Sequence, residues 1–251
     1  LQNMGNLDLY NFVDNHDVER IYTKLSNKAH FTPVHILLYT LPGIPSIYYG
    51  SEFGIEGRKE RSSDDSLRPA LNITDYKDAV TSNPCTALIT ALGKIRQHTP
   101  ALSYGSYTEL QLTNRQYAFA RDLDNMRVII TVNNDDNDAW MNLPAGNAAE
   151  YVGTLTGQKV AVEGGCINVC VGANSGEIWV PTEDTSVPET FSENKDSIVE
   201  ETPVTHEEVK NEGSAETNSS AETGREETGD QGDRNSGEAY HPRACRSDED
   251  A

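Results

Sequence analysis

The sequence has few basic residues and no long apolar run, and each shortage excludes a class of protein. Among its 251 residues, 40 are acidic and 20 are Lys or Arg, which gives a formal net charge of −20. A chain without a basic stripe is a poor nucleic-acid binder, because neutralising phosphates needs clustered cations. The most apolar stretch, residues 34–49, is broken by His35, Pro42, Gly43 and Pro45, so no segment approaches the ~18 residues of a membrane span. We therefore predict no nucleic-acid partner and no membrane partner.

Cysteines are also scarce: Cys85, Cys166, Cys170 and Cys245 are the four in the chain, too few for a disulfide framework at this length. Cys166 and Cys170 lie four positions apart in a strand-like run, so their Cα atoms would be roughly 13 Å apart and could not be bridged. A C-x3-C spacing without a second pair is a weak metal signal. We predict free thiols, no metal or cofactor site in this chain and, from the cysteine usage, a cytoplasmic location.

The negative charge is concentrated at one end of the chain. Residues 181–251 contain 20 acidic and 6 basic residues, a net charge of −14, whereas residues 1–180 carry −6. This segment has no Leu, Met or Trp, and only 13 of its 71 residues are apolar. It therefore buries too little surface to offset an ordering entropy of roughly 1–2 kcal/mol per residue. We predict a disordered acidic tail over residues 181–251.

The pattern of residues 7–49 predicts a strand, a helix and a second strand. Residues 7–13 form a short apolar run that ends in a polar cluster, as does a buried parallel strand whose C-terminal end opens on a site. Residues 31–41 are apolar at helical spacing and end at Pro42-Gly43, and residues 44–49 are the second apolar run. Strand, helix and strand form the parallel βαβ unit. With a further helix at 84–98, we expect residues 1–100 to be the end of a larger α/β domain, since two strands cannot close a parallel fold.

From residue 102 the apolar period changes from 3.6 to 2. Turn-rich pieces separate short alternating runs at residues 107–112, 116–120, 127–132, 167–171 and 178–180. This pattern is typical of an antiparallel β-sandwich, which we place at residues 101–180. The chain opens on Leu1 and enters a strand-like run almost at once, so we expect a fragment of a longer polypeptide, in which a signal peptide would be out of view.

The segment with the strongest functional signal is Phe12-Val13-Asp14-Asn15-His16-Asp17. It sets a carboxylate and an imidazole side by side at the end of a strand. A carboxylate accepts two hydrogen bonds and an imidazole donates one, so the pair suits the vicinal hydroxyls of a sugar. A polar loop that caps the following turn would use the same residues, and the spacing alone does not decide between the two.

Two longer motifs resemble the alpha-amylase family of glycoside hydrolases. Residues 12–17, followed by Arg20, resemble the fourth signature region of that family, and residues 42–52 resemble its final barrel strand, with the pattern G-x-P-x-x-Y-Y-G-x-E. The resemblance covers residues 1–100 and continues more weakly to residue 180. It implies an α/β fold in which the two predicted strands are strands 7 and 8 of a (β/α)8 TIM barrel, followed by the all-β antiparallel sandwich. Active sites of such barrels lie at the C-terminal ends of the strands.

The resemblance also implies roles for individual residues. Asp17 matches the carboxylate that stabilises the transition state by holding two sugar hydroxyls, and His16 matches the neighbouring donor. Asn15, which orients the loop behind His16, and Arg68, in a loop similar to that of cyclomaltodextrinase-like members, are further candidates for substrate binding. The nucleophile and the acid/base of the family follow strands 4 and 5, upstream of this sequence.

We therefore expect the isolated chain to be inactive. Its parent is expected to be a retaining enzyme that hydrolyses α-1,4-glucosidic bonds of starch-like glucans or maltooligosaccharides. Transglycosylation of α-glucans, or a non-catalytic carbohydrate-binding or structural role, are the alternatives. Calcium occurs in many family members and is a candidate cofactor of a full-length parent; the oligomeric state is not indicated.

Several neighbours of the motifs carry weaker signals. Asp14 stands at a position that varies in the family pattern, so it is interpreted as structural or as a support of the neighbouring site residues. Arg20 could hold a carboxylate, but it is interpreted as a surface residue of a loop, and Glu52 is expected to form hydrogen bonds at the barrel mouth. Because successive strand residues point to opposite faces, at most one of Tyr48 and Tyr49 is expected to face the site.

Overall fold

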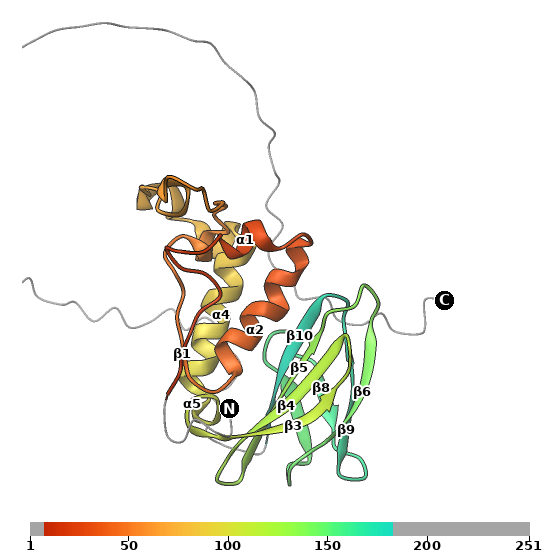
Figure 1. Cartoon of the computed structure of the whole chain (residues 1–251). Helices are drawn as coiled ribbons and strands as arrows, with labels where there is room; N and C mark the ends of the chain where they lie inside the picture. Colours follow the sequence, from red (N-terminus) through yellow and green to blue (C-terminus); the bar gives the residue numbers. More distant parts are fainter. Residues whose placement is uncertain (1–7, 183–251) are drawn as a thin grey trace, which may run out of the picture. The chain divides into compact units, whose positions relative to one another are not determined.

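The computed structural model describes residues 8–182, which begin with a parallel strand pair and its helices. Strand β1 (Tyr10–Asn11) pairs in parallel with β2 (Ile44–Pro45), and helix α2 (Phe31–Thr40) connects them (Figure 1), which confirms the predicted order of strand, helix and strand. Each strand has two residues and is shorter than the predicted runs at residues 7–13 and 44–49. The other helices and 3-10 turns of this part are α1 (Ile21–Lys24), η1 (Lys28–His30), η2 (Ser51–Phe53), η3 (Asp65–Leu67), η4 (Ile73–Tyr76), α3 (Ala79–Ser82), α4 (Pro84–His98) and α5 (Pro100–Tyr104).

Local sequence explains where helix α4 begins. The side chain of Asn83 accepts hydrogen bonds from the backbone N–H groups of Cys85 (2.9 Å) and Thr86 (3.2 Å). Pro84 occupies the first turn of α4, where a backbone N–H would have no acceptor within the helix, so the N–H that proline lacks is not needed there. The predicted bounds of α4 are confirmed, and α2 ends one residue before its prediction.

Within residues 8–182, no helix is long and apolar enough to cross a membrane.

Gly43, just before β2, occupies a position that only glycine fits. Its φ of +116° lies in the region that L side chains rarely adopt, and a Cβ there would lie 2.5 Å from the carbonyl oxygen of Leu9. That same oxygen accepts a hydrogen bond from the backbone N–H of Ile44 (2.7 Å), and the Asn11 side chain donates to Pro42 O (2.8 Å). The pairing of β1 with β2 therefore depends on the missing side chain.

Gly43→Ala is expected to lower the free energy of unfolding by about 1–3 kcal/mol, because it adds backbone strain and a clash at the β1–β2 junction. Gly93→Ala is the matched control: Gly93 lies inside α4 and a Cβ there has its nearest neighbour 4.0 Å away, so alanine should stabilise by about 0.5–1 kcal/mol. Urea denaturation of both variants measures the difference. Equal effects of the same sign would contradict the role given to Gly43.

The second half of the described chain is antiparallel sheet, as the alternating runs predict. Six strands form one sheet in the order β3-β4-β5-β10-β7-β8, and β6 pairs with β9 in a separate ladder. Their bounds are β3 (Ser106–Leu112), β4 (Gln116–Leu123), β5 (Met126–Asn133), β6 (Ala139–Pro144), β7 (Glu150–Gly153), β8 (Lys159–Ala161), β9 (Cys166–Val171) and β10 (Ser175–Pro181). Strands β6, β7 and β8 were not predicted. The domain boundaries at residues 100 and 180 stay predictions, and the predicted disordered tail falls outside the described residues apart from its first two positions.

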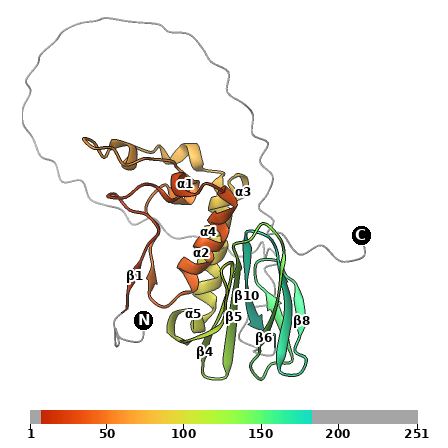
Figure 2. The same cartoon turned by 45° about the vertical axis from the view of Figure 1, so that its right-hand side comes forward.

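Two apolar cores lie on opposite faces of the six-stranded sheet. The first joins Ile36 of α2 and Leu92 of α4 to Ile130 of β5, and the second joins Ile129 of β5 to Val169 of β9. Consecutive strand residues point to opposite faces, so Ile129 and Ile130 enter different cores. Figure 2 shows the helices on one side of β4, β5 and β10, and β6 on the other. The helices and the sheet thus share one core.

The cysteines follow the predicted pattern only in part. Cys85 and Cys166 are free thiols, as predicted. Cys170 is disulfide-bonded, so the prediction of a free thiol is wrong at this position. The spacing argument had excluded only Cys166 as its partner, because residues four apart in a strand cannot be bridged.

Candidate functional site

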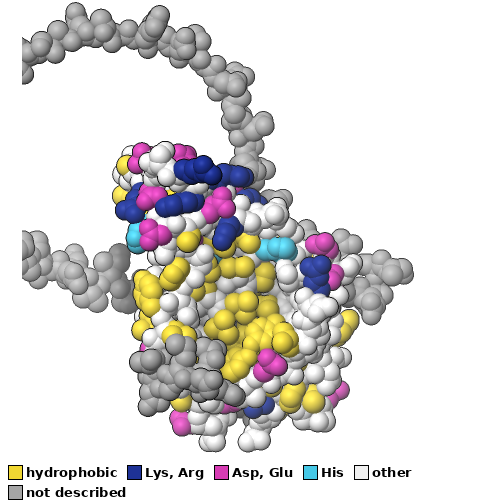
Figure 3. Space-filling view, viewed as in Figure 1, with side chains coloured by type: hydrophobic (Ala, Val, Ile, Leu, Met, Phe, Trp, Pro, Cys, Tyr) yellow, Lys and Arg dark blue, Asp and Glu magenta, His cyan; other side chains and the backbone are white. Residues whose placement is uncertain are grey.

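The segment after β1 brings His16, Asp17 and Arg68 together. His16 Nε2 lies 3.2 Å from Asp17 Oδ2, and these side chains are 51% and 63% exposed. Arg68, which directly follows η3, places Nη2 3.9 Å from Asp17 Oδ1 and 3.6 Å from Asp64 Oδ2. Figure 3 shows charged side chains of both signs gathered at one end of this face. The three predicted site residues thus form one solvent-accessible set of hydrogen-bond donors and acceptors.

Asn15 shapes the loop that presents this set. Its Oδ1 accepts a hydrogen bond from the backbone N–H of Asp17 (2.8 Å), the Asx-turn arrangement in which an asparagine side chain replaces a backbone turn. The interpretation of Asn15 as the residue that orients the loop is confirmed. Its contact with a substrate stays a prediction.

Asp14 is structural, as interpreted from the sequence. Its side chain is buried, Oδ2 accepts a hydrogen bond from the backbone N–H of Ile21 (2.9 Å), and Ser51 Oγ donates to the carboxylate at 2.8 Å. These bonds join the end of β1 to the start of α1 and to the chain that follows β2. The carboxylate beside the exposed pair therefore holds the loop in place and does not face solvent.

Arg20 contradicts its interpretation as a surface residue. Its side chain is 0% exposed, Nη1 donates to Ser51 Oγ (3.3 Å), and the guanidinium carbon lies 4.3 Å from the ring centre of Tyr48. A long charged side chain can be buried when aromatic faces and polar partners surround it. Nothing close to Arg20 in the sequence indicates these partners, since Ser51 lies 31 positions away.

Tyr48 is the aromatic residue that faces the pair. Its ring centre lies 6.4 Å from that of His16, and it meets the Tyr49 ring edge to face at 4.8 Å. Tyr49 is 42% exposed, and its hydroxyl donates to the carbonyl of Pro69 (3.0 Å). In the sequence, two adjacent aromatic residues at the end of a predicted strand indicated that one of them would face the site.

The hydrogen bonding predicted for Glu52 at the barrel mouth stays a prediction. Within the described residues its Oε2 is buried without a hydrogen-bond partner, and its backbone carbonyl accepts from Thr86 Oγ1 (2.8 Å). Residues 8–182 also contain no group of three His, Cys, Asp or Glu side chains that could hold a metal ion. The cofactor prediction stays a prediction.

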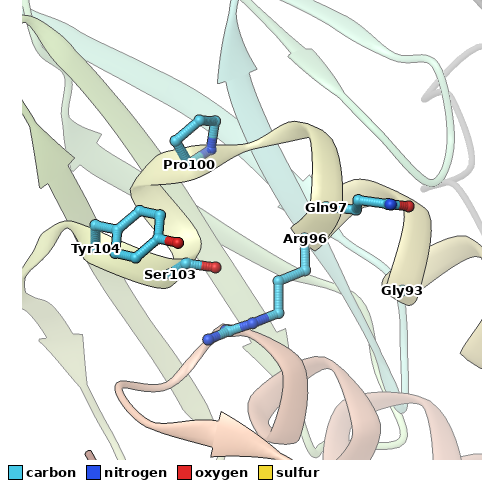
Figure 4. Close-up of a pocket in the computed structure, with 6 residues that line it drawn as sticks. All are labelled: Gly93, Arg96, Gln97, Pro100, Ser103 and Tyr104. Carbon is cyan, nitrogen blue, oxygen red and sulfur yellow. The ribbon is translucent and has the colours of Figure 1, made fainter.

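A shallow hollow of about 380 Å³ lies at the C-terminal end of α4 (Figure 4). Arg96 lines it, but its guanidinium is occupied: Nη1 donates to Tyr39 O (2.6 Å) and Nη2 to Gly43 O (2.7 Å), at the turn between α2 and β2. This arginine satisfies carbonyls at the end of a helix, which otherwise lack partners. The charged residue of the hollow therefore has a structural role, because it links α4 to the turn between α2 and β2. Its other lining residues are Gly93, Gln97, Pro100, Ser103 and Tyr104.

Comparison with known sequences places these motifs in a family. Residues 2–101 match the family model described as the alpha-amylase catalytic domain. A cyclomaltodextrin glucanotransferase from Bacillus sp. (strain 1-1) is 29% identical over 190 residues, which cover 72% of this chain and 26% of that protein. The chain therefore spans about a quarter of the length of the curated relatives that it matches.

Solved structures agree with this match. A debranching enzyme from Nostoc punctiforme is 26% identical with a TM-score of 0.58, over 70% of this chain and 36% of that one. An alpha-amylase from Geobacillus thermoleovorans, solved in complex with acarbose, shares the fold with a TM-score of 0.59 at 20% identity, over 71% of this chain and 40% of that one. The resemblance seen in residues 12–17 and 42–52 is thus confirmed: residues 2–101 match the catalytic domain of the alpha-amylase family of glycoside hydrolases.

Proposed function

We propose that this chain supplies the sugar-aligning wall of a retaining glycosidase that hydrolyses α-1,4-glucosidic bonds in starch-like glucans or maltooligosaccharides. The observation that carries the proposal is the exposed contact of His16 with Asp17 (3.2 Å) at the end of β1. In this role the Asp17 carboxylate accepts hydrogen bonds from two vicinal hydroxyls, and the His16 imidazole donates one. Arg68 and Asn15 add polar groups beside them, and the Tyr48 ring adds an apolar surface.

Asp17 would hold the sugar hydroxyls in the bound complex and hold them more strongly in the transition state. Cleavage of a glycosidic bond passes through an oxocarbenium-like state, and hydrogen bonds to the ring hydroxyls strengthen as positive charge develops on the sugar. An interaction that is stronger in the transition state than in the ground state raises the rate. Asp17 is therefore proposed as the transition-state stabiliser and His16 as its substrate-binding neighbour.

Bond cleavage itself needs two further carboxylates, which in retaining enzymes lie about 5–5.5 Å apart. By resemblance to the family, these follow earlier barrel strands than β1. The Asp14 carboxylate accepts hydrogen bonds from Ser51 and Ile21, and Oε2 of Glu52 is buried. Neither residue is therefore proposed as a substitute for the nucleophile or the acid/base. We propose that the isolated 251-residue chain binds sugar without cleaving it.

The surface around β1 and β2 supports the proposal that these strands belong to a larger barrel. Tyr10, Phe12 and Ile44 are exposed large apolar residues on or next to the two strands. Parallel sheets are ordinarily covered on both faces, and apolar patches of this kind mark surfaces that pack against other protein. By the same resemblance, residues 101–180 are proposed to be the C-terminal β-sandwich domain of the family.

Asp17→Asn is expected to weaken binding of maltoheptaose by about 10- to 100-fold, because hydrogen bonds to a charged group contribute about 1.5–3 kcal/mol. Isothermal titration calorimetry of the 251-residue chain measures it. Asp124→Asn is the matched control: Asp124 is an exposed turn residue with φ +51°, a conformation that asparagine also tolerates. Absence of binding by the unchanged chain, or equal binding by Asp17→Asn, would refute the proposal, and release of reducing sugar by the isolated chain would refute its inactivity.

Transglycosylation is the second candidate, and the names of the curated relatives favour it, since several of them are cyclomaltodextrin glucanotransferases. Hydrolysis and transfer share the same covalent intermediate, which either water or a sugar hydroxyl attacks. The product pattern of a longer protein that contains this chain distinguishes them. Cyclic or elongated glucans would support transfer, whereas reducing sugar alone would support hydrolysis.

A further inference from the structure

The buried guanidinium of Arg20 is only partly satisfied by hydrogen bonds. The backbone N–H of Arg20 donates to Gly57 O (3.0 Å), and Nη1 reaches Ser51 Oγ (3.3 Å). Nε and Nη2 have no hydrogen-bond partner among the residues that the structure describes. Burying a cation away from water costs free energy unless other groups stabilise it. The other groups around the guanidinium therefore indicate the role of Arg20.

Those neighbours are two aromatic rings and one carboxylate. The guanidinium carbon lies 4.3 Å from the ring centre of Tyr48 and 5.3 Å from that of Tyr49. Cation–π attraction is strongest for desolvated groups, and the planar guanidinium stacks on ring faces as a lysine ammonium cannot. The Ser51 hydroxyl, which accepts from Arg20, donates to the carboxylate of Asp14 (2.8 Å), so an opposite charge lies one hydroxyl away.

Two glycines leave the space that Arg20 occupies. A Cβ on Gly50 would lie 3.3 Å from Arg20 Nη2, and one on Gly57 would lie 3.0 Å from Arg20 Cγ. Both distances are tighter than ordinary contacts of a Cβ, so the side chain is closely confined. A confined, stacked guanidinium can fix the plane of the ring that lies on it.

The same ring reaches the exposed pair. The ring of Tyr48 is tilted by 52° against that of His16, at the centroid distance given above, and His16 in turn contacts Asp17. We propose that Arg20 is a positioning residue: it fixes the ring of Tyr48, and Tyr48 holds the His16 imidazole in the orientation in which it meets Asp17. A buried cation would thus set the orientation of the exposed His16–Asp17 pair.

The first test compares two replacements of Tyr48, read by the NMR signal of the His16 imidazole. Tyr48→Phe keeps a ring face for the guanidinium and should leave the Hε1 resonance of His16 nearly unchanged. Tyr48→Leu removes the ring and should shift that resonance. Tyr104→Leu is the matched control, because Tyr104 is an exposed tyrosine of α5 whose loss should not move His16. A His16 signal that is the same in Tyr48→Leu as in the unchanged chain would overturn the proposal.

The second test is a double-mutant cycle of Arg20 and Tyr48. Arg20→Lys keeps the charge and loses the planar stack, so it should shift the His16 resonance as Tyr48→Leu does. In the Tyr48→Leu background, Arg20→Lys should cause little further shift of the His16 resonance, because the Tyr48 ring through which Arg20 acts on His16 is already absent. Additive shifts would overturn the proposal. If Arg20→Lys does not fold, the comparison of the two Tyr48 variants decides alone.

A third readout rests on the proposed sugar-binding function. Tyr48→Leu should weaken maltoheptaose binding about tenfold, equivalent to about 1.4 kcal/mol, while Tyr48→Phe should keep the affinity of the unchanged chain. Equal losses in both variants would mean that the hydroxyl matters and the ring face does not, which overturns the positioning role. If the unchanged chain binds no maltoheptaose, the proposed function fails, whereas the NMR comparison still tests Arg20.

Discussion

Replacing Arg121 with leucine should lower the free energy of unfolding by about 3–5 kcal/mol, because it leaves buried carbonyls without donors. Arg121 lies on β4 and is buried. Its Nη1 donates to Thr40 O (2.7 Å) at the end of α2, and its Nε and Nη2 donate to Gly105 O (3.2 and 2.9 Å). Burial lowers the pKa of Arg121 to about 10, so the side chain stays charged at neutral pH. One guanidinium thus connects the helical part to the sheet.

Arg115→Leu is the matched control for this experiment. Arg115 is exposed and makes one long side-chain contact, 3.4 Å from Nη1 to Asn134 O, so its loss should change stability by no more than about 0.5 kcal/mol. Urea denaturation followed by circular dichroism measures both variants. If Arg121→Leu were as stable as Arg115→Leu, the hydrogen bonds to Thr40 and Gly105 would not contribute to folding.

His35 should make the protein sensitive to acid. Its side chain is buried in α2, where Nδ1 donates to Phe31 O (2.8 Å) and Nε2 has no hydrogen-bond partner among the described residues. Protonation would place a second N–H there without an acceptor. Burial lowers the pKa of His35 to about 4, although the Phe31 carbonyl and the nearby Asp14 carboxylate act in the opposite direction.

The direction of the pH effect follows from that lowered pKa. The unfolded chain binds a proton near the ordinary histidine pKa of about 6.5, whereas the folded protein binds it only near 4. Stability from neutral His35 is therefore complete above about pH 6.5 and is lost as the pH falls towards 4, by about 3 kcal/mol in total.

Urea denaturation at pH 7 and at pH 4 tests this, with His35→Phe as the variant that cannot titrate and keeps an aromatic ring on Phe31. The loss of stability between the two pH values should be smaller in His35→Phe than in the unchanged chain. His98→Gln, at an exposed position on α4, is the control and should retain the full loss. Equal losses in the unchanged chain and in His35→Phe would contradict the role of His35.

Local signals were enough to predict the elements that begin or end on a distinctive residue. Asn83-Pro84 marks the start of α4, and Pro42-Gly43 marks the end of α2, because these residues act on the backbone next to them. The candidate site followed from residues that are close in sequence, His16 and Asp17. The contact of Arg68 with Asp17 agrees with its predicted place at the site, but the residue itself came from the family resemblance and not from any local pattern.

The features that were missed depend on distant contacts. Strands β7 and β8 are short, with 4 and 3 residues. Strand β6 has 6 residues but carries an exposed Trp140 and ends on a proline, so its sequence lacks the alternation of apolar and polar residues that marked the other strands. The burial of Arg20 depends on Ser51 and on the tyrosines that follow β2. No pattern of neighbouring residues encodes which distant side chain will arrive beside a loop.

The shared core of helices and sheet limits how this protein can be recombined with its relatives. A graft that replaced residues 101–182 with the corresponding segment of a homologue would exchange Ile130 and Arg121 while keeping Ile36, Leu92 and the α2 carbonyls that they meet. The junction would fall inside a packed interior, where changes of one methylene are felt. Chimeric proteins built from this chain should therefore transfer α2, α4 and the sheet as one unit.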